Sequence, residues 1–130
     1  MALLPMRLNT DALSDVVVLS EMQALPSCVL TAPRATLTVT NTNDSGSGSL
    51  RQAIIATNSS ATPDRIVFNI GSGVQTIQPL SPLPNILYPV EIDGTTQPGY
   101  TGTPLIQLDG SLAGSDAWGL AFLGGSCVVR

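Results

Sequence analysis

The sequence predicts a mainly β fold, in which short strands stack as successive rungs of a coil and one short α-helix covers the first rung. Three observations favour this fold. Apolar and polar residues alternate in several short segments, as they do in strands with one buried face. The connections between these segments are long and lack the two-residue Asn-Gly loops typical of hairpins. A single segment near residue 50 has helical spacing instead. A sandwich of antiparallel strands is the competing architecture.

Residues 1–35 are set apart from the rest of the chain and are left unassigned. Their stretch "DALSDVVVLSEMQAL" fits a helix that Asp11 caps and Pro26 ends. The valines at 16–18 suit a strand equally well, so both interpretations stay open. The start, "MALLPMRLNTD", lacks the sustained apolar run of a secretory signal. We therefore divide the chain into residues 1–35 and residues 36–130.

The second part begins with a strand and continues into the helix. In "TLTVTNTND", Leu37 and Val39 alternate with threonines, and the glycines of "NDSGSGS" then permit a tight loop. The helix is predicted from four residues at three- and four-residue spacing, which place one apolar stripe on a face: Leu50, Ala53, Ile54 and Thr57. Ser49 or Ser47 can cap its start, and Asn58 can end it. So short a helix is unstable alone in water, so it must lie on a preformed apolar surface.

Repeated strand and turn units follow the helix. "RIVFNI" and "VQTIQPL" are predicted strands, whereas the prolines between residues 79 and 89 keep that segment out of a central ladder. "PVEIDG" and "PLIQLDG" are near copies, and "GLAFLGG" is similar to them. Such repetition suggests that each unit buries its apolar side against its neighbours. Six apolar residues are predicted to form this core: Leu50, Ile54, Ile66, Phe68, Ile92 and Leu108.

The composition excludes several classes of function. The formal net charge is -4, and the chain has no histidine and no lysine. Nucleic-acid binding needs clustered positive charge, so no nucleic-acid partner is expected. Without histidine, Ser-His-Asp and Cys-His catalysis are excluded within this chain. The most apolar run, "AWGLAFLGGSCVV", is shorter than a membrane span requires, so no membrane span is expected.

The two cysteines and five arginines leave structural alternatives. Cys28 and Cys127 lie near opposite ends of the chain, and they either form a disulfide or stay as buried thiols. Arg51 on the predicted helix is expected to pair with Asp44 or Asp64. Two Asn-X-Ser stretches, at 43–45 and 58–60, match the short glycosylation pattern, which often occurs by chance.

Asp93 and Asp109 are the weak candidates for a metal site. Each precedes a glycine at the end of a repeated unit, so stacking of the units would align the two carboxylates, and calcium prefers such oxygen ligands. A glycosidase would also need two carboxylates across a cleft. The interpretation that we prefer is structural, with each aspartate accepting hydrogen bonds from backbone amides in a strand-ending turn. We therefore expect neither a catalytic residue nor a required cofactor in this chain.

Four stretches together resemble a known family: "VTNTNDSGSGSLRQAI", "DRIVFNI", "VEIDGTTQPGYTGTPLIQLDG" and "GLAFLGGSCVVR". They are similar to the amino-terminal end of bacterial right-handed parallel β-helix proteins of the pectin-lyase-like superfamily. The resemblance covers residues 36–130. It implies a right-handed β-helix of few coils with a short capping helix, in a secreted or cell-surface protein.

The resemblance leaves three functions open. The first is a structural scaffold segment without its own catalysis, and this is the function that we expect. The second is the front part of a carbohydrate-active lyase or hydrolase whose active site lies beyond residue 130. The third is an adhesive module that binds polysaccharide or protein. Members of the family continue for more coils, so the chain is expected to be a fragment whose open end can associate with another copy.

Overall fold

The computed structural model describes residues 2–6, 15–19, 27–29 and 34–130. The chain forms two compact units, Met1–Pro33 and Arg34–Arg130. In the first unit, the described residues form three antiparallel strands in the order β1-β2-β3. Their bounds are Ala2–Met6 for β1, Asp15–Leu19 for β2 and Ser27–Val29 for β3.

The strand interpretation of the valine run is correct. Residues 16–18 lie inside β2 and pair with both β1 and β3, so a helix over residues 11–25 is wrong where the structure describes it. Three successive β-branched residues have restricted side-chain rotamers in a helix and favour a pleated strand, which decides the ambiguity. The predicted helix cap Asp11 and the predicted stop Pro26 lie outside the described residues.

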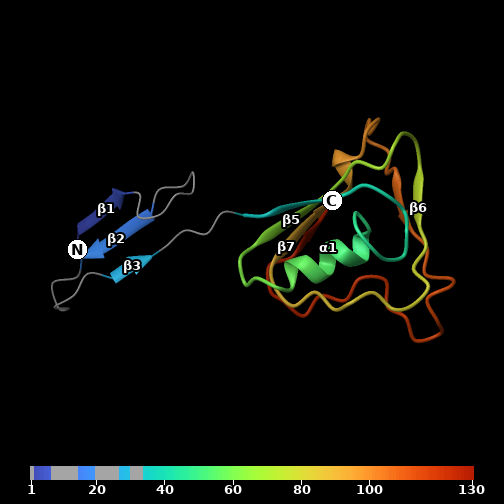
Figure 1. Ribbon diagram of the computed structural model, residues 1–130. Coiled ribbons are helices and arrows are strands. Elements are labelled where there is room, and N and C mark those ends of the chain that lie inside the picture. Colours follow the sequence, from blue (N-terminus) through green and yellow to red (C-terminus); the bar gives the residue numbers. More distant parts are fainter. Residues whose placement is uncertain (1, 7–14, 20–26, 30–33) are drawn as a thin grey trace. The chain divides into compact units, whose positions relative to one another are not determined.

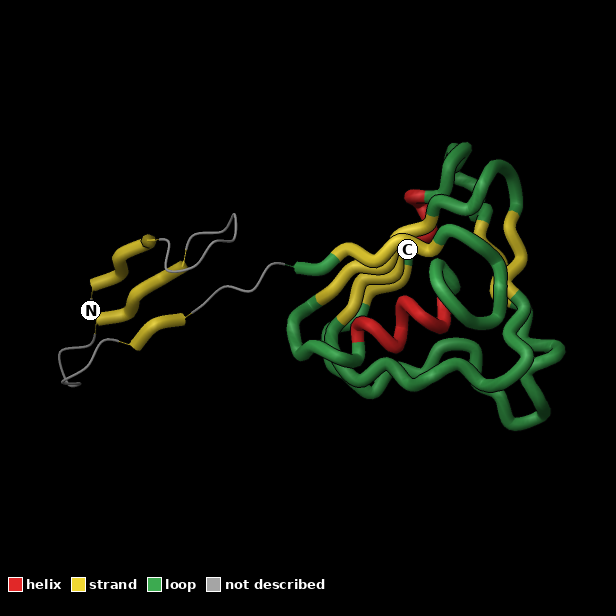
Figure 2. The backbone as a smooth tube through the Cα atoms, viewed as in Figure 1, coloured by secondary structure: helices red, strands yellow, loops and turns green. Residues whose placement is uncertain are grey.

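The second unit contains a four-stranded sheet in which every pair of neighbours is parallel (Figures 1 and 2). The strands follow one another in chain order, β4-β5-β7-β9. Their bounds are Thr36–Val39, Asp64–Phe68, Val90–Asp93 and Val128–Val129. Parallel neighbours require long crossover connections, which explains why the sequence lacks hairpin turns here.

Two further parallel pairings join the connections between these strands. The strands β6 (Gln75–Ile77) and β8 (Ile106–Leu108) form a two-stranded parallel sheet. Ile86 and Phe122 form an isolated parallel bridge. The chain thus visits β5, β6 and Ile86, and then their partners β7, β8 and Phe122, before it reaches β9. We call each passage of the chain from one strand of the four-stranded sheet to the next a circuit.

This circuit corrects the predicted equivalence of the two "DG" units. The strand β7 pairs with β5 and β9, whereas β8 pairs with β6, so the strands before Asp93 and Asp109 belong to different sheets. The two aspartates consequently do not stack in register. Their similar sequences reflect the same local requirement, a short strand followed by a turn, on two different sides of the circuit.

The helix α1 (Leu50–Thr57) forms as predicted. Ser49 is its N-cap, and its Oγ accepts a hydrogen bond from the backbone N–H of Gln52 at 3.2 Å. Asn58 is its C-cap. The four stripe residues are all buried, so the helix presents its apolar face to the core while it runs beside the four-stranded sheet (Figure 2). The only other helical element among the described residues is a short 3₁₀ turn, η1 (Gly94–Thr96), which comes directly after β7.

One hydrophobic core joins α1 and the strands of the second unit. Of the six predicted core residues, five are buried and Leu108 is half-buried against them. The remaining buried members of this cluster are Val39, Ala53, Ile70, Ile77, Ile86 and Val90. These residues alternate with exposed or half-buried ones along the strands, as the burial pattern of β5 shows.

Within the described part of the chain, none of the helices has the length and apolar character that crossing a bilayer requires.

Candidate functional site: a charged network on the outer face of the sheet

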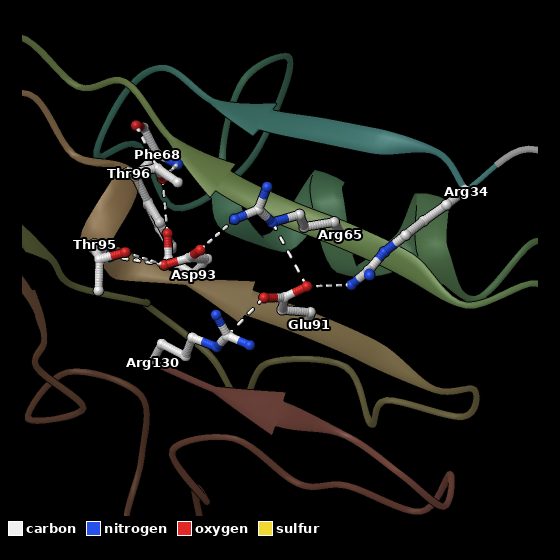
Figure 3. A network of polar contacts seen from close by, with 8 residues as sticks. All are labelled: Arg34, Arg65, Phe68, Glu91, Asp93, Thr95, Thr96 and Arg130. Atoms are coloured by element: carbon white, nitrogen blue, oxygen red, sulfur yellow. Dashed lines mark hydrogen bonds and ion pairs between the residues drawn. The ribbon is translucent and has the colours of Figure 1, made fainter.

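Charged side chains collect on the face of the four-stranded sheet that is turned away from α1 (Figure 3). Arg65 of β5 and Glu91 of β7 are register partners, and both neighbour buried isoleucines in sequence. Because successive side chains of a strand point to opposite faces, the arginine and the glutamate point outward. The alternating pattern of the strands therefore positions this network.

Glu91 is the centre of the network. Three guanidinium groups lie within ion-pair distance of its carboxylate. Arg34 precedes β4, Arg65 lies on β5 and Arg130 follows β9, so the contacts span the sheet (Figure 3). The Nε atoms of Arg65 and Arg130 lie 3.6 and 3.4 Å from the Glu91 carboxylate. The side chain of Glu91 is only 13% exposed, so these contacts are shielded more than an isolated surface pair.

Asp93 occupies a second, more buried position beside Glu91. Its carboxylate accepts hydrogen bonds from the Thr95 backbone N–H at 3.0 Å and the Thr95 hydroxyl at 2.5 Å, and it pairs with Arg65. The hydrogen bond from the Thr95 hydroxyl, together with the contact to Arg65, holds the pKa of Asp93 below its usual value. Asp93 is thus an ionised cap of η1, as the turn interpretation predicts.

Thr96 and Gln97 attach this turn to the preceding circuit. The Thr96 hydroxyl accepts from the Phe68 backbone N–H at 2.8 Å and donates to the Asp93 carbonyl at 2.7 Å. The Gln97 amide accepts from the Ile70 N–H at 3.0 Å and donates to the Ile70 carbonyl at 2.7 Å. The sequence analysis did not single out either residue. The polar run "TTQ" directly after Asp-Gly is the signal that could have identified them.

Both carboxylates of the network, those of Glu91 and Asp93, are paired with arginines. Arg65 contacts both Glu91 and Asp93, and its Nε is buried without a hydrogen-bond partner. A general acid in a glycosidase needs a carboxyl group whose pKa is raised, whereas that of Asp93 is lowered. The geometry therefore suits a structural role, in which the ion pairs join the strands of the four-stranded sheet.

Asp109 makes a separate turn at the end of β8. It accepts hydrogen bonds from the Ser111 backbone N–H at 2.9 Å and from the Gln78 side-chain amide at 3.0 Å. The hydrogen bonds from Ser111 lower the pKa of Asp109. Across the residues that the structure describes, no group of three or more His, Cys, Asp or Glu side chains is arranged to hold a metal ion.

A second polar network attaches α1 to the loop before Ile86. Arg51 pairs with Asp44 at 2.7 Å, which confirms one of the two predicted partners, and donates to the carbonyls of Ser81 and Pro82 at 2.8 and 2.7 Å. Asp44 also accepts from the Leu80 N–H at 2.9 Å. The hydrogen bond from Arg51 is the main reason that the pKa of Asp44 is lowered.

The thiol of Cys127 is free and half-buried. Its Sγ lies 3.5 Å from the carbonyl oxygen of Gly124 and 3.7 Å from that of Tyr88.

An apolar cavity of about 200 Å³ lies beside the core. Most of its lining comes from β7 and the chain that follows it, and includes Ile92, Leu108, Leu120 and Val129. Phe68 and Leu50 contribute from earlier elements. The cavity exceeds the roughly 150 Å³ of an engineered cavity that binds benzene, so it has room for a large apolar side chain.

Comparison of the chain with protein-family models, with curated proteins and with solved structures found no match.

Proposed function

We propose that Arg34–Arg130 is the capping segment and the first coils of a right-handed parallel β-helix, and that it acts as a structural scaffold without catalysis of its own. The single observation that carries this proposal is the repeated circuit. β5, β6 and Ile86 pair in parallel with β7, β8 and Phe122, in the same order along the chain. A coil with three sides is the simplest path that satisfies all of these pairings.

The handedness follows from a general rule of chain topology. Crossovers between parallel strands of one sheet are right-handed in about 98% of cases. The helix α1 supports the placement of the cap, because it follows β4, the edge strand that begins the stack, and buries its stripe in the core. A helix in this position shields apolar surface that an open first coil would expose to water.

The polar contacts favour a scaffold over an enzyme. Asp44, Asp93 and Asp109 each have a lowered pKa and are engaged by neighbouring donors. Carboxylates held in this way stabilise turns and strand ends, and they are poor proton donors at neutral pH. The resemblance to pectin-lyase-like β-helix proteins further supports a secreted or cell-surface location, which we include in the proposal.

Nuclear magnetic resonance tests the architecture. We expect nuclear Overhauser contacts between Ile66 and Ile92, between Ile77 and Leu108, and between Ile86 and Phe122, in the pattern of parallel strands. Strong contacts between α-protons of facing residues, which mark antiparallel pairs, would instead support the sandwich and refute the scaffold.

An antibody tests the proposed location. An antibody against residues 34–130 should label intact source cells or their medium, and exclusively intracellular labelling would contradict that part of the proposal.

The scaffold is expected to fold without calcium. The carboxylate oxygens of Asp93 and Asp109 already accept hydrogen bonds from Thr95, Ser111 and Gln78. Adding EDTA should therefore leave the thermal unfolding midpoint unchanged, and calcium should not raise it. A midpoint that rises with calcium and falls with EDTA would instead support calcium binding by the chain.

A further inference from the structure

The segment at residues 79–85, which follows β6, makes no backbone–backbone hydrogen bond with the residues that the structure describes. Three of its seven residues are prolines, which lack the N–H that a strand ladder needs. The segment nevertheless runs along α1, and its Leu83 packs against the hydrophobic core (Figure 1). Side chains must therefore hold its backbone in place, and we call this segment the strap.

One end of the strap is bound near the start of α1. The Arg51 guanidinium donates to the carbonyls of Ser81 and Pro82 at 2.8 and 2.7 Å. The Asp44 carboxylate, which pairs with Arg51, accepts a hydrogen bond from the Leu80 N–H at 2.9 Å. Because the Arg51 side chain is only 14% exposed, these bonds are partly shielded from competing water.

The other end of the strap is bound by Asn58, the C-cap of α1. Its side-chain N–H donates to the Asn85 carbonyl at 2.7 Å. Its side-chain oxygen accepts from the N–H of Leu87, just beyond the strap, at 2.9 Å. Arg51 and Asn58 are about two helical turns apart, so the hydrogen-bonded helix fixes the spacing between the two attachments.

We infer that α1 and the strap form a lid that opens and closes as one unit over the hydrophobic core. The strap has no strand ladder of its own, so its order depends on α1. A helix as short as α1 is in turn unstable unless other parts of the chain hold it. Loss of either attachment should therefore make the other easier to release.

This inference goes beyond the proposed scaffold, because it rests on the contacts of the strap and not on the handedness of the coil. Local units of a protein can open at a lower free-energy cost than the strands of its core. The lid is expected to be such a unit, with the parallel strands still paired when it opens.

Hydrogen exchange followed by magnetic resonance tests the lid, when each variant is examined at an amide that the changed side chain does not contact. In Arg51→Met, the amide of Leu87 should exchange at least about tenfold faster than in the original chain. In Asn58→Ala, the amide of Leu80, at the opposite end of the strap, should accelerate to a similar extent. The two variants thus test the same coupling from both ends.

Two controls separate opening of the lid from general destabilisation. The amide of Asn69, which donates to the last residue of β4, should keep its exchange rate in both variants. Arg34→Met is the matched arginine control, because Arg34 pairs with Glu91 on the outer face of the sheet. This variant should leave the exchange of Leu80 and Leu87 unchanged.

Three results would overturn the inference. If the amide at the far end of the strap keeps its rate, the two ends open independently. If Asn69 accelerates by the same factor as the strap, the whole unit opens in one step without a separate lid. Equal acceleration in Arg34→Met would likewise assign the effect to general destabilisation. None of these results bears on the proposed scaffold, which the parallel contacts between Ile66 and Ile92 decide.

Discussion

Gln97 shows how one buried side chain joins distant parts of the chain. It is 1% exposed, and its amide satisfies both the N–H and the C=O of Ile70. Ile70 lies two residues beyond the end of β5, so none of the strand pairings satisfies its backbone N–H and C=O. A buried amide with both donor and acceptor ends meets this need, and no apolar residue of similar size does.

Gln97→Leu should therefore lower the free energy of unfolding by about 2 kcal/mol or more, because it leaves both groups of Ile70 unpaired. The matched control is Gln107→Leu on β8, an exposed position where a change of about 0.5 kcal/mol or less is expected. Urea denaturation of both variants measures the difference. Equal midpoints would show that water replaces the Gln97 amide.

The lowered pKa of Asp93 predicts how the free energy of unfolding depends on pH. Its pKa is lower in the folded chain than the usual value near 3.9, so the folded state holds this proton less tightly than the unfolded state. The stabilisation is complete above about pH 4 and is lost as pH falls through the lower folded pKa. Asp93→Asn should thus reduce stability at pH 7 and flatten the loss of stability between pH 5 and pH 2, measured by urea denaturation at several pH values.

The exposed residue Asp116 offers the control for this series. Asp116→Asn should leave the acid dependence close to that of the original chain. An acid dependence that survives Asp93→Asn unchanged would assign the effect to other carboxylates, such as Asp44.

At the scale of the element, two isoleucines of the helix α1 can show whether burial of apolar side chains or intrinsic helix propensity stabilises the helix. Adjacent isoleucines on this helix lie in opposite environments, since Ile54 is 0% exposed and Ile55 is 47% exposed. Both have the same intrinsic helix propensity, so a difference between them reports on packing alone.

Ile54→Asp should unfold the second unit or cost about 3 kcal/mol or more, because it buries an unpaired charge. Ile55→Asp should change stability by about 0.5 kcal/mol or less. Circular dichroism during thermal unfolding compares the two. Similar losses in both variants would mean that α1 contributes through local helix formation and not by covering the core.

Local patterns in the sequence predicted α1 correctly, but they did not predict which strands pair with each other. The cap at Ser49 and the buried stripe involve residues close in sequence, so their spacing carries the information. The pairing of β8 with β6 involves strands that lie in different circuits, and the similarity of "PVEIDG" and "PLIQLDG" suggested the wrong partner. The bonds of Thr96 and Gln97 were missed for the same reason, because Phe68 and Ile70 lie far away in sequence.

At the scale of the whole second unit, stability should fall from the first strand pair to the last. Among the strands that the structure describes, β5 has neighbours on both sides, whereas β9 pairs only with β7. The Asn69 N–H donates to Val39 and the Arg130 N–H donates to Ile92, so the two amides make similar bonds at opposite ends of the stack. Hydrogen exchange is governed by the local opening around each amide.

The Asn69 amide should exchange at least about tenfold more slowly than the Arg130 amide. Amide exchange followed by magnetic resonance at low protein concentration measures both rates. Uniform protection of the two amides would indicate that the unit opens in a single cooperative step.

The hydrogen bonds of Asn58 affect the choice of expression host. This residue begins one of the two Asn-X-Ser stretches, yet its side-chain amide donates to the Asn85 carbonyl at 2.7 Å and accepts from the Leu87 N–H at 2.9 Å. A host that glycosylates Asn-X-Ser stretches would attach a bulky glycan to the side-chain Nδ2 atom of Asn58. A glycan on Asn58 would occupy the atom that binds Asn85, and the loop around Ile86 could not close against α1. Chains modified at Asn58 should therefore be retained as misfolded protein, and Ser60→Ala should restore their release.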